Sequence, residues 1–195
     1  MLRTHTCGEL TEKQVNKSTT LCGWLHARRD HGGMVFIDLR DRYGMTQIVF
    51  DKSCSGDFEK LRREDCIQVE GTVKKRKTGK ELKGMKTGKI EIHAKKLIML
   101  NESQTPPLEV DDRIIATDEL RLQYRYLDLR RPIMQKQFQL RHKAAQATRD
   151  YLSKENFLEI ETPLLVRETP EGARDYLVPS RVNPGKFYSL PQSPQ

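Results

Sequence analysis

The sequence lacks long apolar runs. No stretch of its 195 residues is apolar enough to span a bilayer, and the opening Met1–His5 lacks the apolar segment of a signal peptide. We therefore expect a cytoplasmic protein with no membrane partner. Cysteine is also scarce: the four cysteines form no Cys-x-x-Cys pair, which favours reduced thiols over disulfides or a metal site.

Nucleotide-binding signatures are missing as well. The segment Gly79–Lys86 lacks the Gly-Lys-Ser/Thr ending of a phosphate-binding loop. Neither Gly-x-Gly-x-x-Gly nor His-Glu-x-x-His occurs in the chain. Short motifs alone therefore name no reaction.

Acidic residues are few in one part of the chain. The net charge is +8, and residues 1–105 hold 21 Lys/Arg against 14 Asp/Glu, whereas residues 106–195 hold 14 against 13. Between Lys74 and Lys96, ten basic residues meet only two acidic ones. A polyanion is the natural partner of such a surface, although a charge run of this kind also occurs as a solvated, flexible loop.

Alternating polar and apolar residues predict five strands in the first hundred positions. Gly32–Gly33 supplies the hairpin turn between the first two strands, and a short helix is expected at Cys54–Arg63. This order is typical of an all-β OB-fold, a five-stranded Greek-key barrel that binds oligonucleotides on its second and third strands. The predicted strands are 21–28, 35–39, 45–51, 67–74 and 89–100.

One aromatic side chain stands out in the second strand. The alternation turns Phe36 away from the apolar row and places it beside the turn that holds Arg28 and Arg29, on the face that also carries Gln47. An outward ring flanked by cations can stack an unpaired base while screening the phosphates beside it. A second-layer core residue or an ordinary surface phenylalanine is the alternative.

The second half of the chain reads as helix and then strand. Two prolines at Thr105–Pro107 begin a linker, a helix starts at Thr117, and a longer helix spans about 134–155. The alternating run 157–165 predicts a strand, and its Pro163 indicates a sheet edge or an interface. We divide the chain into a barrel domain (1–105), a linker or hinge (106–132) and an α+β part (133–195).

Several strings resemble bacterial-type aspartyl-tRNA synthetases, and the resemblance covers the whole chain. It implies an anticodon-binding OB-fold, a hinge and the start of a class II catalytic domain, cut short at residue 195. The parent of such a fragment is a homodimeric ligase of protein biosynthesis that activates L-aspartate with ATP and Mg²⁺ and transfers it to tRNA(Asp). The asparagine and lysine enzymes of the subgroup are disfavoured by the string 171–181. The resembling strings are 21–41, 124–132, 169–181, 186–188 and 190–195.

The same resemblance implies how the anticodon is read. Phe36 matches the aromatic that stacks on the middle anticodon base, and Gln47 matches the side chain that reads its edge. Glu91 matches a residue at the wobble base, with a rim carboxylate balancing a nearby lysine as the alternative. Arg28 and Arg29 resemble backbone and base contacts.

Two further residues bear on which tRNA is accepted. His31, in the turn after the first strand, and Gly79, in the loop before the fifth, resemble the non-discriminating type that also charges tRNA(Asn). A small Gly leaves room that a bulky or cationic side chain would fill, and specificity often depends on such a repulsive element. An ordinary polar turn residue is the alternative for His31.

In the second half, the resemblance implies three ligands of L-aspartate and one interface residue. Glu171 matches a mobile loop that pairs with the substrate ammonium, Ser193 and Gln195 match the amino-acid pocket, and Pro163 matches the dimer interface. No catalytic residue, metal ligand or ATP-binding arginine of the family is expected within the chain. We therefore expect the chain to bind tRNA but not to activate aspartate; a stand-alone tRNA-binding module without catalysis is the alternative.

Overall fold

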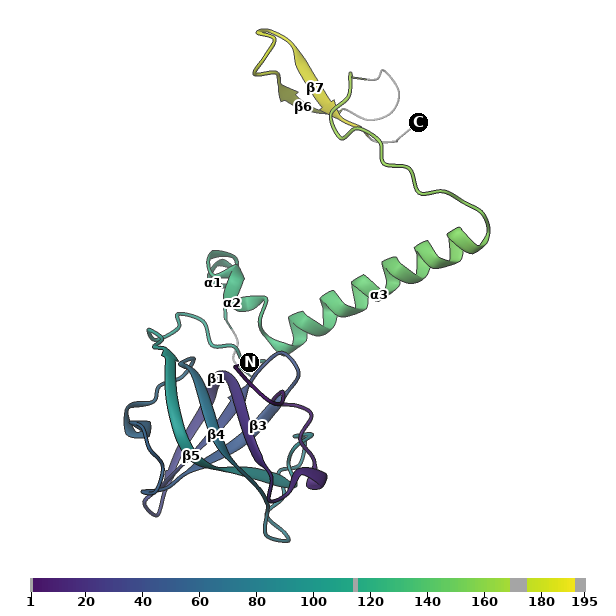
Figure 1. Ribbon diagram of the computed structural model, residues 1–195. Helices are drawn as coiled ribbons and strands as arrows, with labels where there is room; N and C mark the ends of the chain where they lie inside the picture. The colour runs from purple at the N-terminus through teal and green to yellow at the C-terminus, as the bar shows by residue number, and fades with distance from the viewer. Residues whose placement is uncertain (1, 114–115, 169–174, 192–195) are drawn as a thin grey trace. The chain divides into compact units, whose positions relative to one another are not determined.

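The computed structural model describes residues 2–113, 116–168 and 175–191 (Figure 1). The chain divides into two compact units, Met1–Gln135 and Lys136–Gln195. Each unit is described by itself.

Five strands of the first unit close into a barrel (Figure 1). Their order around the barrel is β1-β2-β3-β5-β4, with β3 and β5 parallel and the other neighbours antiparallel. This confirms the predicted five-stranded OB-fold. The strands are β1 (Ser18–His31), β2 (Met34–Arg40), β3 (Met45–Phe50), β4 (Cys66–Lys75) and β5 (Ile90–Asn101).

The barrel interior is filled by alternate apolar side chains of all five strands. Leu25, Ile37, Ile48, Ile67 and Ile92 are each 0% exposed. The period-2 pattern therefore separates an apolar inside from a polar outside, and the outer side chains are free to form a binding face.

A β-bulge in β1 changes which of its side chains share the face of Phe36. The register of β1 on β2 shifts between Leu25 and Ala27, so Arg29 pairs with Phe36 and Arg28 pairs with Ile37. Strict alternation along residues 21–28 predicts Arg28 on the outer face with Trp24 and His26. This prediction is wrong, because a bulge adds one residue and reverses the alternation beyond it.

The turns and helices follow the sequence with two exceptions. Gly32 and Gly33 have φ of +60° and +79°, as a two-residue hairpin turn requires. The predicted helix 54–63 is only the 3-10 turn η2 (Phe58–Lys60), one of two such turns with η1 (Glu12–Gln14). The helix predicted to start at Thr117 is divided at Tyr124 into two shorter helices. The helices are α1 (Asp118–Gln123), α2 (Arg125–Asp128) and α3 (Pro132–Lys154).

The helix α3 confirms the predicted long helix to within two residues at each end. Its first residue is a proline, which suits the first helical turn because the N–H there has no partner within the helix. Across the described ranges, the helices fall short of the combined length and apolar character that a bilayer crossing demands.

The strand predicted at 157–165 is absent from the structure. Only Val166, just beyond it, makes an isolated bridge, to Ser189 of β7. A strand needs a neighbour for its backbone groups, Pro163 has no N–H to donate, and the described residues place no strand beside this run. The second unit holds instead a two-stranded sheet of β6 (Tyr176–Pro179) and β7 (Phe187–Leu190).

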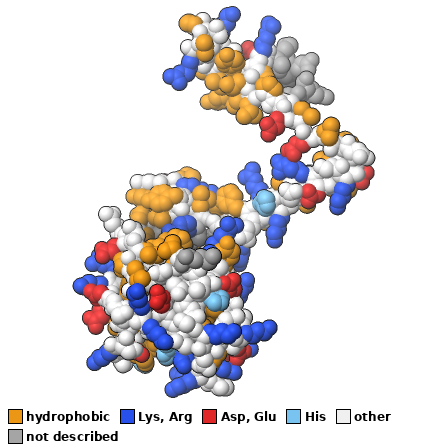
Figure 2. All heavy atoms as spheres, in the orientation of Figure 1, with side chains coloured by type: hydrophobic (Ala, Val, Ile, Leu, Met, Phe, Trp, Pro, Cys, Tyr) orange, Lys and Arg blue, Asp and Glu red, His pale blue; other side chains and the backbone are white. Residues whose placement is uncertain are grey.

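Apolar side chains of the second unit are mostly exposed. Among its described residues only Ser189 is buried. Figure 2 shows hydrophobic side chains gathered where β6 and β7 lie. Further exposed apolar residues flank Pro163: Phe157, Leu158, Ile160, Leu164 and Leu165. The described residues of this unit therefore bury little apolar surface against one another.

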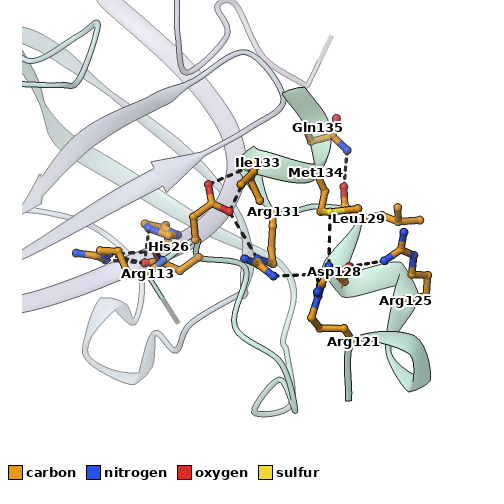
Figure 3. Close-up of polar contacts among 12 residues, drawn as sticks. His26, Arg113, Arg121, Arg125, Asp128, Leu129, Arg131, Ile133, Met134 and Gln135 are labelled. Atoms are coloured by element: carbon orange, nitrogen blue, oxygen red, sulfur yellow. Dashed lines mark hydrogen bonds and ion pairs between the residues drawn. The ribbon is translucent and has the colours of Figure 1, made fainter. Parts of the chain in front are cut away.

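A buried carboxylate organises the segment between the barrel and α3 (Figure 3). Asp128 is 0% exposed and accepts hydrogen bonds from Arg121 (3.1 Å), Arg125 (2.6 Å) and Arg131 (3.0 Å). These bonds join α1, α2 and the start of α3. The part of the predicted linker from Arg121 to Arg131 is therefore held together within the first unit.

Two more aspartates, Asp111 and Asp112, form polar contacts in the same segment. Asp111 binds Arg113 and lies 3.8 Å from Nε2 of His26 on β1. Asp112 accepts from the backbone N–H of Ile133 (3.0 Å), which is one of the free N–H groups at the start of α3.

An arginine of the same segment stacks on the barrel. The guanidinium carbon of Arg130 lies 4.9 Å from the centre of the Trp24 ring, and its Nη2 lies 3.0 Å from Glu64. Glu64 also binds Arg40 of β2 through both carboxylate oxygens, at 2.9 Å each. Arg130 is thus held against the outer surface of the barrel, directly at Trp24 of β1 and through Glu64 at Arg40 of β2.

The Asp128 cluster predicts an acid-sensitive contribution to stability. Burial raises the pKa of Asp128, but hydrogen bonds from Arg121 and Arg131 outweigh it, so the pKa lies below its usual range. Since the folded pKa is lower than the unfolded one, the contribution is present above about pH 4 and is lost as the pH falls through the folded value.

We expect Asp128→Asn to lower the free energy of unfolding by about 2 kcal/mol at pH 7, and this deficit to shrink below about pH 4. Urea unfolding at a series of pH values measures it. Asp118→Asn is the control, because Asp118 binds the same Arg121 but its side chain is 84% exposed. A deficit that stays constant down to pH 3 contradicts the role given to the charge.

Candidate nucleic-acid interface

A row of side chains crosses the outer face of the barrel. Phe36 on β2 is partly exposed and pairs with Arg29 on β1 and with Val49 on β3. Val49 pairs in turn with His93 on β5. The outer face therefore carries the Phe36 ring on β2, with Arg29 on the neighbouring strand β1 and the imidazole of His93 two strands away on β5.

A second row of polar groups lies beside the first. Asp38 pairs with Gln47 across β2 and β3, and its Oδ1 accepts from Arg29 (2.8 Å). Gln47 is 5% exposed, and its Oε1 accepts from Nη2 of Arg76 (2.7 Å). Polar groups this deeply buried are stable only when they are bonded, so these contacts fix the side chains in place.

The charges on this face alternate in sign. Arg76 Nη1 lies 3.8 Å from Oε2 of Glu91, and Oε1 of Glu91 lies 3.0 Å from Nε2 of His93. Arg29, Asp38, Arg76 and Glu91 thus alternate in charge across the face, and the imidazole of His93 lies beside Glu91. Each cation has a carboxylate beside it, so the face is ordered before any ligand arrives.

The buried cation of this face keeps its charge. Burial lowers the pKa of the Arg76 guanidinium, while Glu91 and Asp38 raise it again. A guanidinium stays protonated under such conditions. Arg76 therefore acts as a fixed donor of hydrogen bonds under the face.

This arrangement is suited to one unpaired base. The Phe36 ring offers a stacking surface, Arg29 beside it offers a cation, and Gln47 and Glu91 offer polar groups for a base edge. Figure 2 shows Lys and Arg side chains around the barrel, interspersed with acidic ones. The surface is compatible with the polyanion expected from the charge of this half.

Arg28 lies elsewhere. Its Nη1 donates to the backbone carbonyls of Glu59 and of Leu61 (3.1 Å), and its Nη2 contacts Asp30 (3.1 Å). These bonds hold the loop between β3 and β4 against β1. The structure thus brings Arg29 to the Phe36 face and engages Arg28 with a loop.

The two residues linked to tRNA choice lie in turns. His31 is exposed at the end of β1 and pairs with Met34. Gly79, in the β4–β5 loop, has φ of +82°, and a Cβ added there would meet nothing within 4 Å. Backbone conformation thus gives a second reason for glycine at this position.

The remaining predicted site residues belong to the second half of the chain. Pro163 is exposed in the second unit. Glu171, Ser193 and Gln195 lie outside the described residues. Within the described ranges, no three His, Cys, Asp or Glu side chains are grouped to hold a metal ion.

Sequence reasoning missed three residues of the face. Arg76 is hidden in a run of lysines, and nothing in the local pattern separates it from them. Asp38 and His93 alternate with apolar residues on their strands, which placed them outside the core without indicating their partners. Asp38 is recognised as part of the face only from the structure, which pairs it with Gln47 across β2 and β3.

Two family models match parts of the chain. Residues 19–100 match the model of the OB-fold nucleic acid binding domain. Residues 117–195 match that of the class II tRNA synthetases (D, K and N).

Whole-chain comparison finds curated relatives named aspartate–tRNA(Asp/Asn) ligase. One, from Oleidesulfovibrio alaskensis, is 54% identical over 99% of this chain, and another, from Geobacillus, is 53% identical over 99%. The chain covers 32% and 33% of their lengths, so it spans about a third of these relatives.

Solved structures resemble the chain as well. An asparaginyl-tRNA synthetase from Pyrococcus horikoshii, solved with asparaginyl-adenylate, has a TM-score of 0.81 at 28% identity, over 99% of this chain and 43% of that one. A putative aspartyl-tRNA synthetase from Leishmania major shares the fold, with a TM-score of 0.82 at 24% identity over 98% and 39% of the chains. The chain is thus similar, over 99% of its length, to about a third of the length of each of these aspartate–tRNA(Asp/Asn) ligases. Its first part matches an OB-fold nucleic-acid-binding domain and its second part matches the class II tRNA synthetases.

Proposed function

We propose that the chain is the anticodon-reading part of an aspartate–tRNA ligase and that it also supplies part of the aspartate pocket. The observation that carries the proposal is the partly exposed Phe36 ring, which lies on the outer face of a closed barrel between Arg29 and Val49. The relatives' names and the class II match support the reaction class.

Five side chains have separate roles in this reading of the anticodon. Phe36 stacks on the middle anticodon base, which is uridine because aspartate codons have adenosine in second place. Gln47 reads the edge of that base, and Glu91 reads the wobble base. Arg29 contacts the RNA directly, whereas Arg28 supports the contact by holding the β3–β4 loop.

The parent enzyme joins aspartate to tRNA in two steps. The aspartate carboxylate attacks the α-phosphate of ATP to give aspartyl adenylate and pyrophosphate, and a hydroxyl of the tRNA 3′ end then displaces AMP to form the ester. In this chain Glu171 would pair with the substrate ammonium, and Ser193 and Gln195 would line the pocket. We assign ATP and Mg²⁺ mainly to residues of the parent that are not in this chain, as the family resemblance implies.

The parent's setting follows from the same assignment. We place it in the cytoplasm as a homodimer whose interface includes Pro163 and the exposed apolar residues around it. The alternative, a stand-alone tRNA-binding module, is not favoured, since residues 117–195 match a synthetase family and the relatives are named ligases.

Phe36→Ala tests the reading of the anticodon. We expect it to weaken binding of an aspartate anticodon stem-loop by about 1–3 kcal/mol, because one base loses its stacking partner. Fluorescence anisotropy with a labelled stem-loop measures this. Tyr43→Ala is the matched control, because Tyr43 is 55% exposed with Arg3 over its ring but is not part of the Phe36 face. Equal losses in both variants contradict the proposal.

His31 and Gly79 support acceptance of both tRNAs. We expect the complete enzyme to charge transcripts of tRNA(Asp) and tRNA(Asn) at comparable rates, since the Gly79 turn carries no side chain that would exclude a different third anticodon base. Aminoacylation with labelled aspartate measures both rates. Failure on tRNA(Asn) alone removes this part of the proposal and leaves anticodon reading intact.

A further inference from the structure

We propose that Arg76 is a positioning residue that fixes the Gln47 amide with its NH₂ group toward the RNA, so that the face selects uridine over cytidine. The inference rests on the proposed function and adds to it a residue that acts from beneath the binding face.

Arg76 is held from three directions. Its Nε donates to the backbone carbonyl of Ile90 (3.1 Å), its Nη2 donates to Oε1 of Gln47 (2.7 Å), and its Nη1 lies 3.8 Å from Glu91. The Arg76 side chain is only 6% exposed. It therefore lies under the face, where it orients the groups that would touch a base.

The charge of Arg76 decides which way the amide faces. A guanidinium can only donate hydrogen bonds, so the Gln47 atom that it contacts is the carbonyl oxygen, and the amide nitrogen points away from it. No described residue accepts a hydrogen bond from this nitrogen, and it is not among the fully buried polar atoms that lack a partner. This nitrogen is thus an unbonded donor that keeps some access to solvent, although Gln47 as a whole is only 5% exposed.

A fixed donor distinguishes the two pyrimidines. Uracil carries an acceptor oxygen at position 4, whereas cytosine carries an amino group there. The outward NH₂ of Gln47 bonds to the oxygen and opposes the amino group. Without Arg76 the amide can rotate by half a turn and offer its oxygen to cytosine, so the preference falls.

The test compares two anticodon stem-loops that differ only in the middle base, uridine or cytidine. We expect the wild-type chain to prefer uridine and Arg76→Met to reduce the ratio of the two dissociation constants about tenfold, which corresponds to one oriented hydrogen bond. Lys77→Met is the matched control, since it removes the same charge from an exposed neighbour. It should weaken both complexes and leave the ratio unchanged.

A second variant keeps the test decisive if Arg76→Met does not fold. Gln47→Glu retains an acceptor for Arg76 but replaces the outward NH₂ with an oxygen, so we expect the preference to turn toward cytidine. In a Gln47→Leu background, Arg76→Met should change the ratio no further, because Arg76 acts through Gln47.

The outcomes separate the two proposals. A wild-type chain that binds both stem-loops equally, or that is unaffected by Phe36→Ala, overturns the proposed function and this inference together. A wild-type preference that survives both Arg76→Met and Gln47→Glu overturns the inference alone.

Discussion

The parallel pairing of β3 with β5 is the constraint on which the binding face depends. It closes the barrel, and it places His93 beside Val49 although the two residues are far apart in the sequence. Glu91, two residues earlier on β5, comes to the same face and within reach of Arg76. Without this closure, Phe36 and Gln47 would lack Glu91 and His93 beside them.

Burying charged side chains in this face costs desolvation free energy, and the attraction between neighbouring charges of opposite sign offsets that cost. Asp38 and Arg76 are each less than 10% exposed, and each is bonded to a partner that is itself held by the sheet. Such networks contribute little net stability, because desolvation opposes attraction. What they provide is orientation, since a polar group with fixed partners presents only one of its faces to a ligand.

Local sequence patterns predict much of the fold, but they do not predict the pairwise contacts of the site. Alternation predicts the five strands, the outward Phe36 and the Gly32–Gly33 turn because each depends on neighbours in sequence. The bulge at Leu25–Ala27 leaves no such trace, so Arg28 was placed on the wrong face. Arg76 could not be singled out among lysines, because its partners lie on other strands. Residues 157–165 alternate as a strand would, but they form none, because no other strand lies beside them among the described residues.

The central claim is that one bare ring on the closed barrel stacks on an unpaired base. Nuclear magnetic resonance of a stem-loop labelled with ¹³C at the middle uridine tests it directly. If the base stacks on Phe36, the ring current shifts its H5 and H6 signals upfield when the chain binds, and the shifts disappear when Phe36 is replaced by leucine. Binding of the stem-loop with unmoved H5 and H6 signals would contradict the account.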